Sequence, residues 1–433
     1  MIAARDARHM ILRDVLHRWP AVAAGAAHGV RMAAGLVVIK LISVITGPAG
    51  LGALGNLMSV VTMITVFAGG GIMNGVTKYV AEYRRAPERL DGFLRSAVAF
   101  SAIFSLLLLL VTTAAAAPIA NWLFTDAGLA WAVPLIGVAQ AFGAIGAFVV
   151  AVANGQYRSD LFAFVTISAH LLAIPCAAAL IALGGFPGAV LAVLSIPAWT
   201  AVPALWLIAR GTLRLSIHRP ALDRGDARRL LTFGAMTLVS AASFPLAEIA
   251  IRSSLIAREG VAEAGLWQAL IRLSGAIMGF VTVYLGTSYM PRLSACPERR
   301  RLVAMVLRQL LIVAISFAAL ALVLYLLRAQ LIALLFSQDF MPLADVIHWQ
   351  LLGDTARVCA YVIGFLAIAK ASLRFHVIAE ICQFGLWAGI SLLVIERSGG
   401  TRELAQAYAV TYAIYLAAAL LALALFSRRP SSQ

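Results

Sequence analysis

Hydrophobic residues along the chain gather into long stretches that are separated by short polar segments. Each stretch runs about 20 residues, the length that a helix needs to cross a bilayer, and none shows the alternation typical of barrel strands. The pattern therefore predicts twelve transmembrane helices with short connections. The predicted spans are residues 23–47, 51–79, 93–116, 128–153, 160–183, 187–209, 230–256, 262–290, 303–327, 341–369, 373–395 and 404–427.

The composition leads to the same prediction. Of the 433 residues, 62% are hydrophobic and only 12% are charged, whereas a soluble domain carries about 25% charged residues. A chain of this length with so few charges cannot cover its surface with polar groups in water. We therefore expect an integral membrane protein of the all-α class.

The basic residues between the predicted spans lie mainly on one side of the membrane. The loops on that side hold 23 Arg and Lys residues, and the loops on the opposite side hold four. Because positive residues are retained on the cytoplasmic side, both termini are predicted to be cytoplasmic. The net charge of +15 belongs to this retention signal, and we expect no nucleic-acid partner.

An arginine-rich connection at 210–229 divides the spans into two sets of six. "GPAGLGALGNLMSV" (47–60) leads into the second span and "EGVAEAGLWQALIRL" (259–273) leads into the eighth, with Gly52 and Gly265 about half a chain apart. Chance likeness of two Gly-bearing turns is the alternative to an internal repeat. Parallel repeats are typical of transporters that bind substrate between their halves, so we predict two six-helix lobes around a central cavity. The predicted parts are a cytoplasmic tail at 1–22, an N-lobe at 23–209, a cytoplasmic linker at 210–229, a C-lobe at 230–427 and a cytoplasmic tail at 428–433.

Ionisable residues inside spans are costly, and they usually face a cavity or a partner. Glu248 with Arg252, and Asp354 with Arg357, have the helical spacing of internal ion pairs. Apart from these pairs the chain has one acidic residue, Glu380, against a surplus of basic residues, and this predicts a cationic cavity for an anionic substrate. Basic residues near span ends could instead reach the lipid headgroups. The surplus consists of Arg31, Lys40, Lys78, Arg272, Arg308 and Lys370.

The lysines show an unusual distribution. The chain has 31 Arg and only three Lys, and Lys40, Lys78 and Lys370 all lie in spans or at their ends. A compact, strongly hydrated ammonium suits a wet chamber that handles an anion. We predict that these three lysines and Arg252 converge on one solvent-reachable chamber between the halves.

No motif in the chain indicates catalysis. There is no G-x-x-x-x-G-K-[ST] loop, so ATP bound to this chain is not the expected energy source. The four cysteines lack the spacing of a metal site, and none lies where an oxidising compartment would pair it. We expect no catalytic residue, cofactor or metal, and therefore no enzyme. Asp354 and Glu380 are candidates as proton-coupling or structural carboxylates.

Several stretches resemble one family of transporters. They are "GPAGLGALGN" (47–56), "GGGIMNGVTKYVAEY" (69–83), "WQLLGD" (349–354), "IAKASLRF" (368–375) and "AQAYAVTYAIY" (405–415). They look like the lipid III flippases, which are Wzx-type members of the multidrug/oligosaccharidyl-lipid/polysaccharide exporter superfamily. By this resemblance the substrate-binding residues are Arg31, Lys40, Asn74, Lys78, Arg252, Lys370 and Arg374, and their polar partners are Asn56, Asp354, Glu380 and Gln383. Arg272 and Glu248 match no charged position of the family.

The resemblance implies a V-shaped transporter that flips an undecaprenyl diphosphate-linked trisaccharide of enterobacterial common antigen. Transport would run by alternating access from the cytoplasmic to the periplasmic leaflet of the bacterial inner membrane. The implied partners are the anionic glycolipid, the bilayer and the polymerase of the same pathway. A flippase for an O-antigen or exopolysaccharide unit is one alternative. A drug exporter of the same superfamily is another, although it should show acidic residues in the first lobe, where the spans of this chain carry only basic ones.

Overall fold

The structure is a computed structural model, and it describes residues 2–124, 127–212, 221–369 and 373–428. These residues are almost entirely helical and contain no strand. The first helices are α1 (Ile2–Val66), η1 (Ala68–Gly70), α2 (Met73–Tyr83), α3 (Pro87–Ala114), α4 (Ala116–Phe124), η2 (Ala127–Ala132), α5 (Val133–Gly155), α6 (Ser159–Ser195), η3 (Pro197–Thr200) and α7 (Ala201–Ala209). The later helices are α8 (Arg224–Glu259), α9 (Val261–Tyr284), the π-turn η4 (Leu285–Tyr289), α10 (Met290–Ala295), α11 (Arg299–Leu326), α12 (Arg328–Leu335), η5 (Gln338–Asp345), α13 (Ile347–Ala369), α14 (Leu373–Glu396) and α15 (Thr401–Arg428).

The helices account for the predicted spans. Among the described residues, nine apolar helical stretches are long enough to cross a membrane. Two of them, of 59 and 51 residues, are broken by a left-handed glycine, at Gly47 and at Gly185, so each covers two predicted spans. The seventh predicted span lies in α8, outside these nine stretches. The prediction of an all-α integral membrane protein with twelve spans is confirmed.

The chain forms two compact units, and their boundaries fall inside α1 and α8. The first unit holds the residues up to Gly35 and Val61–Ala241, and the second holds Leu36–Val60 and the residues from Ala242 onward. The units share most of their residues with the predicted lobes. They differ because residues 36–60 belong to the second unit and because the first part of α8 belongs to the first.

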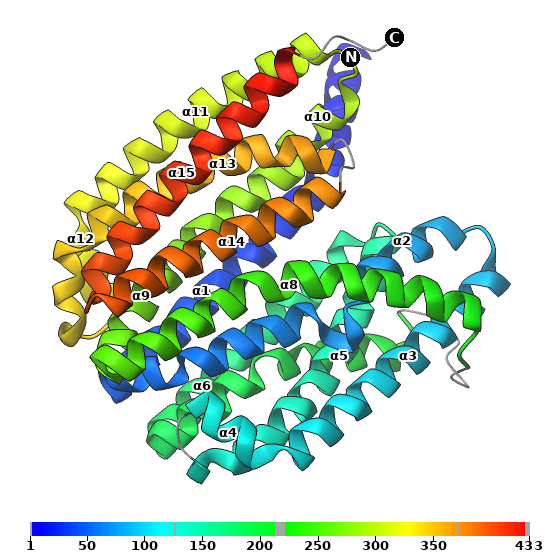
Figure 1. Cartoon of the computed structure of the whole chain (residues 1–433). Coiled ribbons are helices and arrows are strands. Elements are labelled where there is room, and N and C mark those ends of the chain that lie inside the picture. The colour runs from blue at the N-terminus through cyan, green and yellow to red at the C-terminus, as the bar shows by residue number, and fades with distance from the viewer. Residues whose placement is uncertain (1, 125–126, 213–220, 370–372, 429–433) are drawn as a thin grey trace. The chain divides into compact units, whose positions relative to one another are not determined.

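Each unit has its own buried core. In the first unit, Val76, Phe93 and Val152 bring α2, α3 and α5 together, and all three are fully buried. In the second unit, α15 packs along α13 and α14 (Figure 1). Its core includes the buried rings of Trp267 and Trp387, which stack with their centroids 6.1 Å apart. Both cores are apolar, as the span composition predicts.

Residues with positive φ support the predicted internal repeat. Gly47 (φ 64°) and Gly260 (φ 92°) stand at matching positions, each just before one of the two repeat stretches. Gly185 (φ 55°) and Ser398 (φ 61°) are separated by the same number of positions as Gly47 and Gly260. Left-handed residues are uncommon outside glycine, so a matching series of them in both halves favours a true repeat over chance likeness.

The two glycines of the repeat stretches lie against each other within the second unit. A Cβ on Gly52 would lie 2.1 Å from the carbonyl oxygen of Val261, and a Cβ on Gly265 would lie 1.8 Å from that of Pro48. Only glycine allows the backbones of α1 and α9 to approach this closely. The sequence likeness thus marks a contact between corresponding positions of the two halves.

The second predicted span is not one continuous helix. Gly69, Gly70 and Gly71 all have positive φ (63°, 86° and 71°), and they interrupt the helix between α1 and α2. Three left-handed residues in a row cannot continue a right-handed helix. The hydroxyl of Ser101 donates a hydrogen bond to the carbonyl of Gly69 (3.3 Å), which satisfies one backbone group in the break.

Candidate functional site

The second unit contains a buried polar cluster around Arg252 of α8. This guanidinium has no exposed surface. It donates to Asn56 Oδ1 (2.8 Å) and Ser59 Oγ (3.3 Å) of α1, and to Gln268 Oε1 (3.0 Å) of α9. Its Cζ also lies 5.4 Å from the ring centroid of Trp267. Arg252 therefore ties three helices together through hydrogen bonds that are screened from water.

Glu248 completes this cluster one turn before Arg252. The predicted i,i+4 pair is present, with 4.0 Å between Arg252 Nη2 and Glu248 Oε2. Ser59 Oγ donates to the same carboxylate oxygen at 2.7 Å. A close approach makes room for the arginine, because a Cβ on Gly55 would lie 2.3 Å from Arg252 Nε. The sequence resemblance names Arg252 and Asn56, and the structure brings these two together.

A second buried cluster connects α9, α13 and α15. The hydroxyl of Tyr408 donates to Asp354 Oδ1 (2.8 Å) and accepts a hydrogen bond from Arg357 Nη1 (3.0 Å). Ser274 donates to the other oxygen of Asp354 (2.7 Å) and accepts from Gln350 Nε2 (2.7 Å). The pairing of Asp354 with Arg357 predicted from their spacing is thus made through a tyrosine that lies between them.

Aromatic rings surround Arg357. Its Cζ lies 5.1 Å from the ring centroid of Tyr412, 5.3 Å from that of Tyr361 and 5.4 Å from that of Phe244. Its Nε and Nη2 donate to the Tyr361 hydroxyl at 3.1 and 2.9 Å. These contacts stabilise a buried cation through ring quadrupoles and neutral acceptors.

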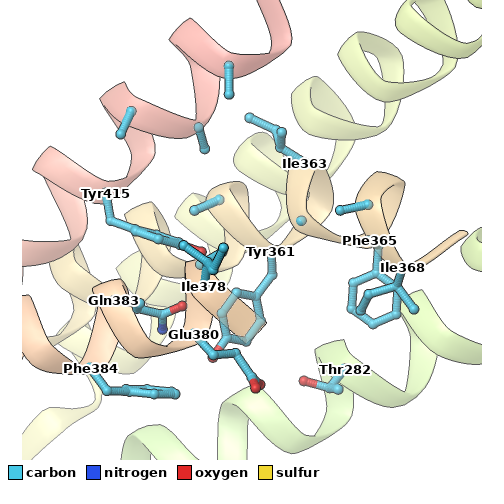
Figure 2. Close-up of a pocket in the computed structure, with 17 residues that line it drawn as sticks. Thr282, Tyr361, Ile363, Phe365, Ile368, Ile378, Glu380, Gln383, Phe384 and Tyr415 are labelled. Carbon is cyan, nitrogen blue, oxygen red and sulfur yellow. The ribbon is translucent and has the colours of Figure 1, made fainter. Parts of the chain in front are cut away.

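Tyr361 separates Arg357 from a cavity of about 530 Å³ in the second unit. The cavity is lined by residues of α9, α13, α14 and α15, and Figure 2 shows the carboxylate of Glu380 and the hydroxyl of Thr282 pointing toward one another there. Gln383, which also lines the cavity, donates to the hydroxyl of Tyr412 (3.1 Å). The cavity therefore combines a few polar groups with mostly apolar walls, a composition typical of small-molecule sites.

Lys40 lies apart from both clusters, although it belongs to the same unit. Its ammonium donates to the carbonyl of Ala333 (2.8 Å) and to that of Phe336, at the end of α12. Cationic side chains commonly satisfy the last carbonyls of a helix in this way. In the described structure the lysine therefore caps α12.

The remaining described site residues belong to the first unit. Arg31 is exposed and donates to His28 Nδ1 (2.8 Å). Asn74 and Lys78 are exposed on α2, and the Lys78 ammonium lies 4.9 Å from the ring centroid of Tyr79 and 5.6 Å from that of Phe233. Lys78 is thus accessible, whereas Arg252 is enclosed. The convergence of these residues on one chamber stays a prediction.

Two further predicted residues have no described side chain. Lys370 lies outside the described residues, and Arg374 lies in the first turn of α14. Among the described residues, no group of three His, Cys, Asp or Glu side chains is placed to hold a metal ion.

Sequence reasoning missed the tyrosines that organise the second unit. Tyr408, Tyr412 and Tyr415 recur at helical spacing in "AQAYAVTYAIY" and all face the interior of this unit, with the rings of the first two 4.6 Å apart. This stripe of hydroxyl-bearing rings inside a span is visible in the sequence. Tyr361 and Thr282 carry no comparable signal, because single hydroxyls are common in spans.

Arg272 of α9 differs from the other arginines of the second unit. It is half-buried, and among the described residues its Nε and Nη2 atoms are buried without a hydrogen-bond partner. Unsatisfied buried nitrogens cost stability. We expect Arg272→Met to raise the free energy of unfolding by about 1 kcal/mol or more, measured as a higher Tm of the purified protein in detergent. Arg357→Met is the matched control and should lower Tm, because Arg357 is fully bonded. A lower Tm for Arg272→Met would show that its nitrogens are satisfied in the native protein.

The fold is shared with solved membrane transporters. A multidrug resistance MATE family transporter of the MOP superfamily, in its inward-facing conformation, matches with a TM-score of 0.76 and 16% identity over 94% of this chain and 96% of that chain. A MOP superfamily transporter from Pyrococcus furiosus matches with a TM-score of 0.63 and 13% identity over 94% of this chain and 95% of that chain. At such identities the likeness concerns the fold, and it defines this chain as a transporter-type, multi-pass membrane protein.

Sequence relatives narrow this class to one family. The family model for "polysaccharide biosynthesis protein" matches residues 22–296. The lipid III flippase of Escherichia coli (strain K12) is 38% identical over 387 residues, which cover 89% of this chain and 93% of the relative. The lipid III flippase of Shigella flexneri matches equally well. The chain belongs to the polysaccharide biosynthesis protein family, and within it to the family of the lipid III flippases.

Proposed function

We propose that this protein flips a polyprenyl diphosphate-linked oligosaccharide, of the lipid III type, from the cytoplasmic to the periplasmic leaflet of a bacterial inner membrane. The observation that carries the proposal is the 38% identity to lipid III flippases along nearly the whole of both chains. The surplus of basic residues in the spans supports it, since the substrate headgroup is anionic. In this proposal both termini are cytoplasmic, and transport runs by alternating access.

The proposed binding residues follow the sequence prediction. Lys78 is exposed on α2, and in the proposal it meets the diphosphate first, together with Lys370 and Arg374. Arg31, Lys40, Asn74 and Arg252 would contribute as the protein changes conformation. The polymerase of the same pathway is the proposed protein partner, since it consumes the flipped product.

Complementation tests the proposed function. The gene is expressed in a strain that lacks its own lipid III flippase, and surface antigen is scored with an antibody. Restored antigen is the expected result. A protein that reaches the membrane but restores none would contradict the lipid III assignment. In that case strains lacking O-antigen or exopolysaccharide flippases would test the nearest alternatives.

We propose Glu380 rather than Asp354 as a proton-exchanging carboxylate. Asp354 is enclosed by Ser274 and Tyr408, whereas Glu380 lines a cavity. Glu380→Gln keeps the shape of the side chain but cannot ionise. We expect the flipping rate of this variant to become independent of pH between about pH 6 and 8, while the wild-type rate varies. If the variant keeps the wild-type rate and pH profile, Glu380 is a structural carboxylate, and the membrane potential alone would drive transport.

A further inference from the structure

We propose that the cavity behind Tyr361 is a saccharide subsite, which holds one neutral or amino sugar of the lipid-linked oligosaccharide. The inference rests on the proposed function and adds to it a place in the fold where the sugar binds. It is carried by three features of the second unit: the polar groups at one end of the cavity, the aromatic and small side chains along its walls, and the sign of its charge.

The polar end of the cavity offers both kinds of hydrogen-bonding group. The carboxylate of Glu380 can accept hydrogen bonds from two neighbouring sugar hydroxyls. Thr282 and Tyr361 carry hydroxyls on the facing wall (Figure 2). The Tyr361 oxygen already accepts two hydrogen bonds from Arg357, so its own proton can be donated elsewhere. A polyol therefore finds acceptors and donors within one small space.

The remaining walls suit the faces of a sugar ring. A pyranose presents C–H bonds on its two faces and hydroxyls around its rim, and aromatic side chains provide large, rigid apolar surfaces for such faces. Phe384 and Tyr415 supply rings, and Ala360, Ala418 and Ala422 keep the space open. The volume of about 530 Å³ lies in the range of about 300–1,000 Å³ that small-molecule sites occupy.

The charge of the cavity selects among the parts of the substrate. Glu380 is its acidic lining residue, and the nearby Arg357 directs three nitrogens at tyrosine hydroxyls rather than into the cavity. A diphosphate or an acidic sugar would meet a like charge in Glu380. A length of polyprenyl chain is the other candidate occupant, but it would leave the polar groups without partners, which is unfavourable. A neutral or amino sugar satisfies both conditions.

Filling the cavity tests the proposal. Ala418 and Ala417 are neighbours on α15 and both are exposed, but only Ala418 lines the cavity. Ala418→Phe fills the cavity, and Ala417→Phe is the matched control. Binding to the full-length protein in detergent is followed by tryptophan fluorescence, with two probes: undecaprenyl diphosphate carrying an oligosaccharide, and undecaprenyl diphosphate alone. Flipping of the first probe is measured in proteoliposomes.

We expect Ala418→Phe to weaken binding and flipping of the oligosaccharide-bearing lipid about tenfold or more, and to leave binding of undecaprenyl diphosphate unchanged. Ala417→Phe should behave as wild type. Equal weakening of both probes would assign the cavity to the lipid part and overturn the saccharide subsite, as would wild-type behaviour of Ala418→Phe. If the wild-type protein neither binds nor flips the first probe, the proposed function fails, and the subsite fails with it.

A second variant covers the case in which Ala418→Phe does not fold. Thr282→Val removes the hydroxyl at the polar end without changing the size of the side chain. It should weaken binding of the oligosaccharide-bearing lipid several-fold and leave binding of undecaprenyl diphosphate unchanged. Unchanged binding of both probes by Thr282→Val would contradict the proposed role of the polar end.

Discussion

Replacing Arg252 by alanine is expected to lower the free energy of unfolding by about 3–5 kcal/mol, the cost of removing one partner of a buried charge pair. The substitution leaves Glu248 buried beside an empty space. It also removes the donor to Asn56 Oδ1 and both donors to Gln268 Oε1. Buried polar groups without partners account for most of this loss.

Thermal unfolding in detergent, followed by tryptophan fluorescence, measures the effect of Arg252→Ala. The control is Arg258→Ala, because Arg258 is an exposed residue at the end of the same helix and donates to one backbone carbonyl, that of Glu396 (3.2 Å). We expect the control to unfold at nearly the wild-type temperature. If Arg252→Ala unfolds at that temperature too but no longer flips substrate, Arg252 serves substrate binding rather than cohesion of the second unit.

Gly265→Ala is the second substitution with a large expected effect. The new Cβ would lie 1.8 Å from the carbonyl oxygen of Pro48 and 3.1 Å from the backbone nitrogen of Gly52. Both neighbours are backbone atoms, so they cannot move aside as the end of a flexible side chain can. The helices α1 and α9 must separate, and we expect a loss of about 3 kcal/mol or more in the free energy of unfolding.

Gly275→Ala is the matched control for this substitution. Gly275 lies on the same helix, α9, and a Cβ there would meet nothing within 4 Å. Alanine at this position should stabilise the helix by about 0.5–1 kcal/mol. The comparison is made by thermal unfolding of both purified variants. Equal stability of the two variants would contradict the close approach of α1 and α9.

The span pattern predicted the fold well because long apolar stretches leave few alternatives in a membrane. The repeat was also visible, since glycines at Gly52 and Gly265 are required by a backbone contact. The break at Gly69–Gly71 was not predicted, although its glycines are plain in the sequence. Hydropathy does not distinguish a continuous helix from one that is interrupted by left-handed residues, because both are equally apolar.

The candidate site was predicted in part. Spacing found the Glu248–Arg252 pair and grouped Asp354 with Arg357, because such pairs lie within one helix turn. It did not find that Tyr408 lies between the latter two, because that contact joins residues of α13 and α15. Contacts between helices depend on how the helices rotate against one another, and a single sequence gives little information on rotation. The same reason hid the cavity at Tyr361.

Flipping by the purified protein in proteoliposomes tests the central claim most directly. The substrate is undecaprenyl diphosphate carrying a labelled oligosaccharide, and its appearance in the opposite leaflet is followed with a sugar-cleaving enzyme that cannot enter the vesicles. We predict transfer without ATP and well above that of protein-free vesicles. We also predict faster transfer when the receiving side is positive, since a potential of 100 mV contributes about 2.3 kcal/mol per charge. Transfer no faster than in protein-free vesicles, from correctly inserted protein, would contradict the account.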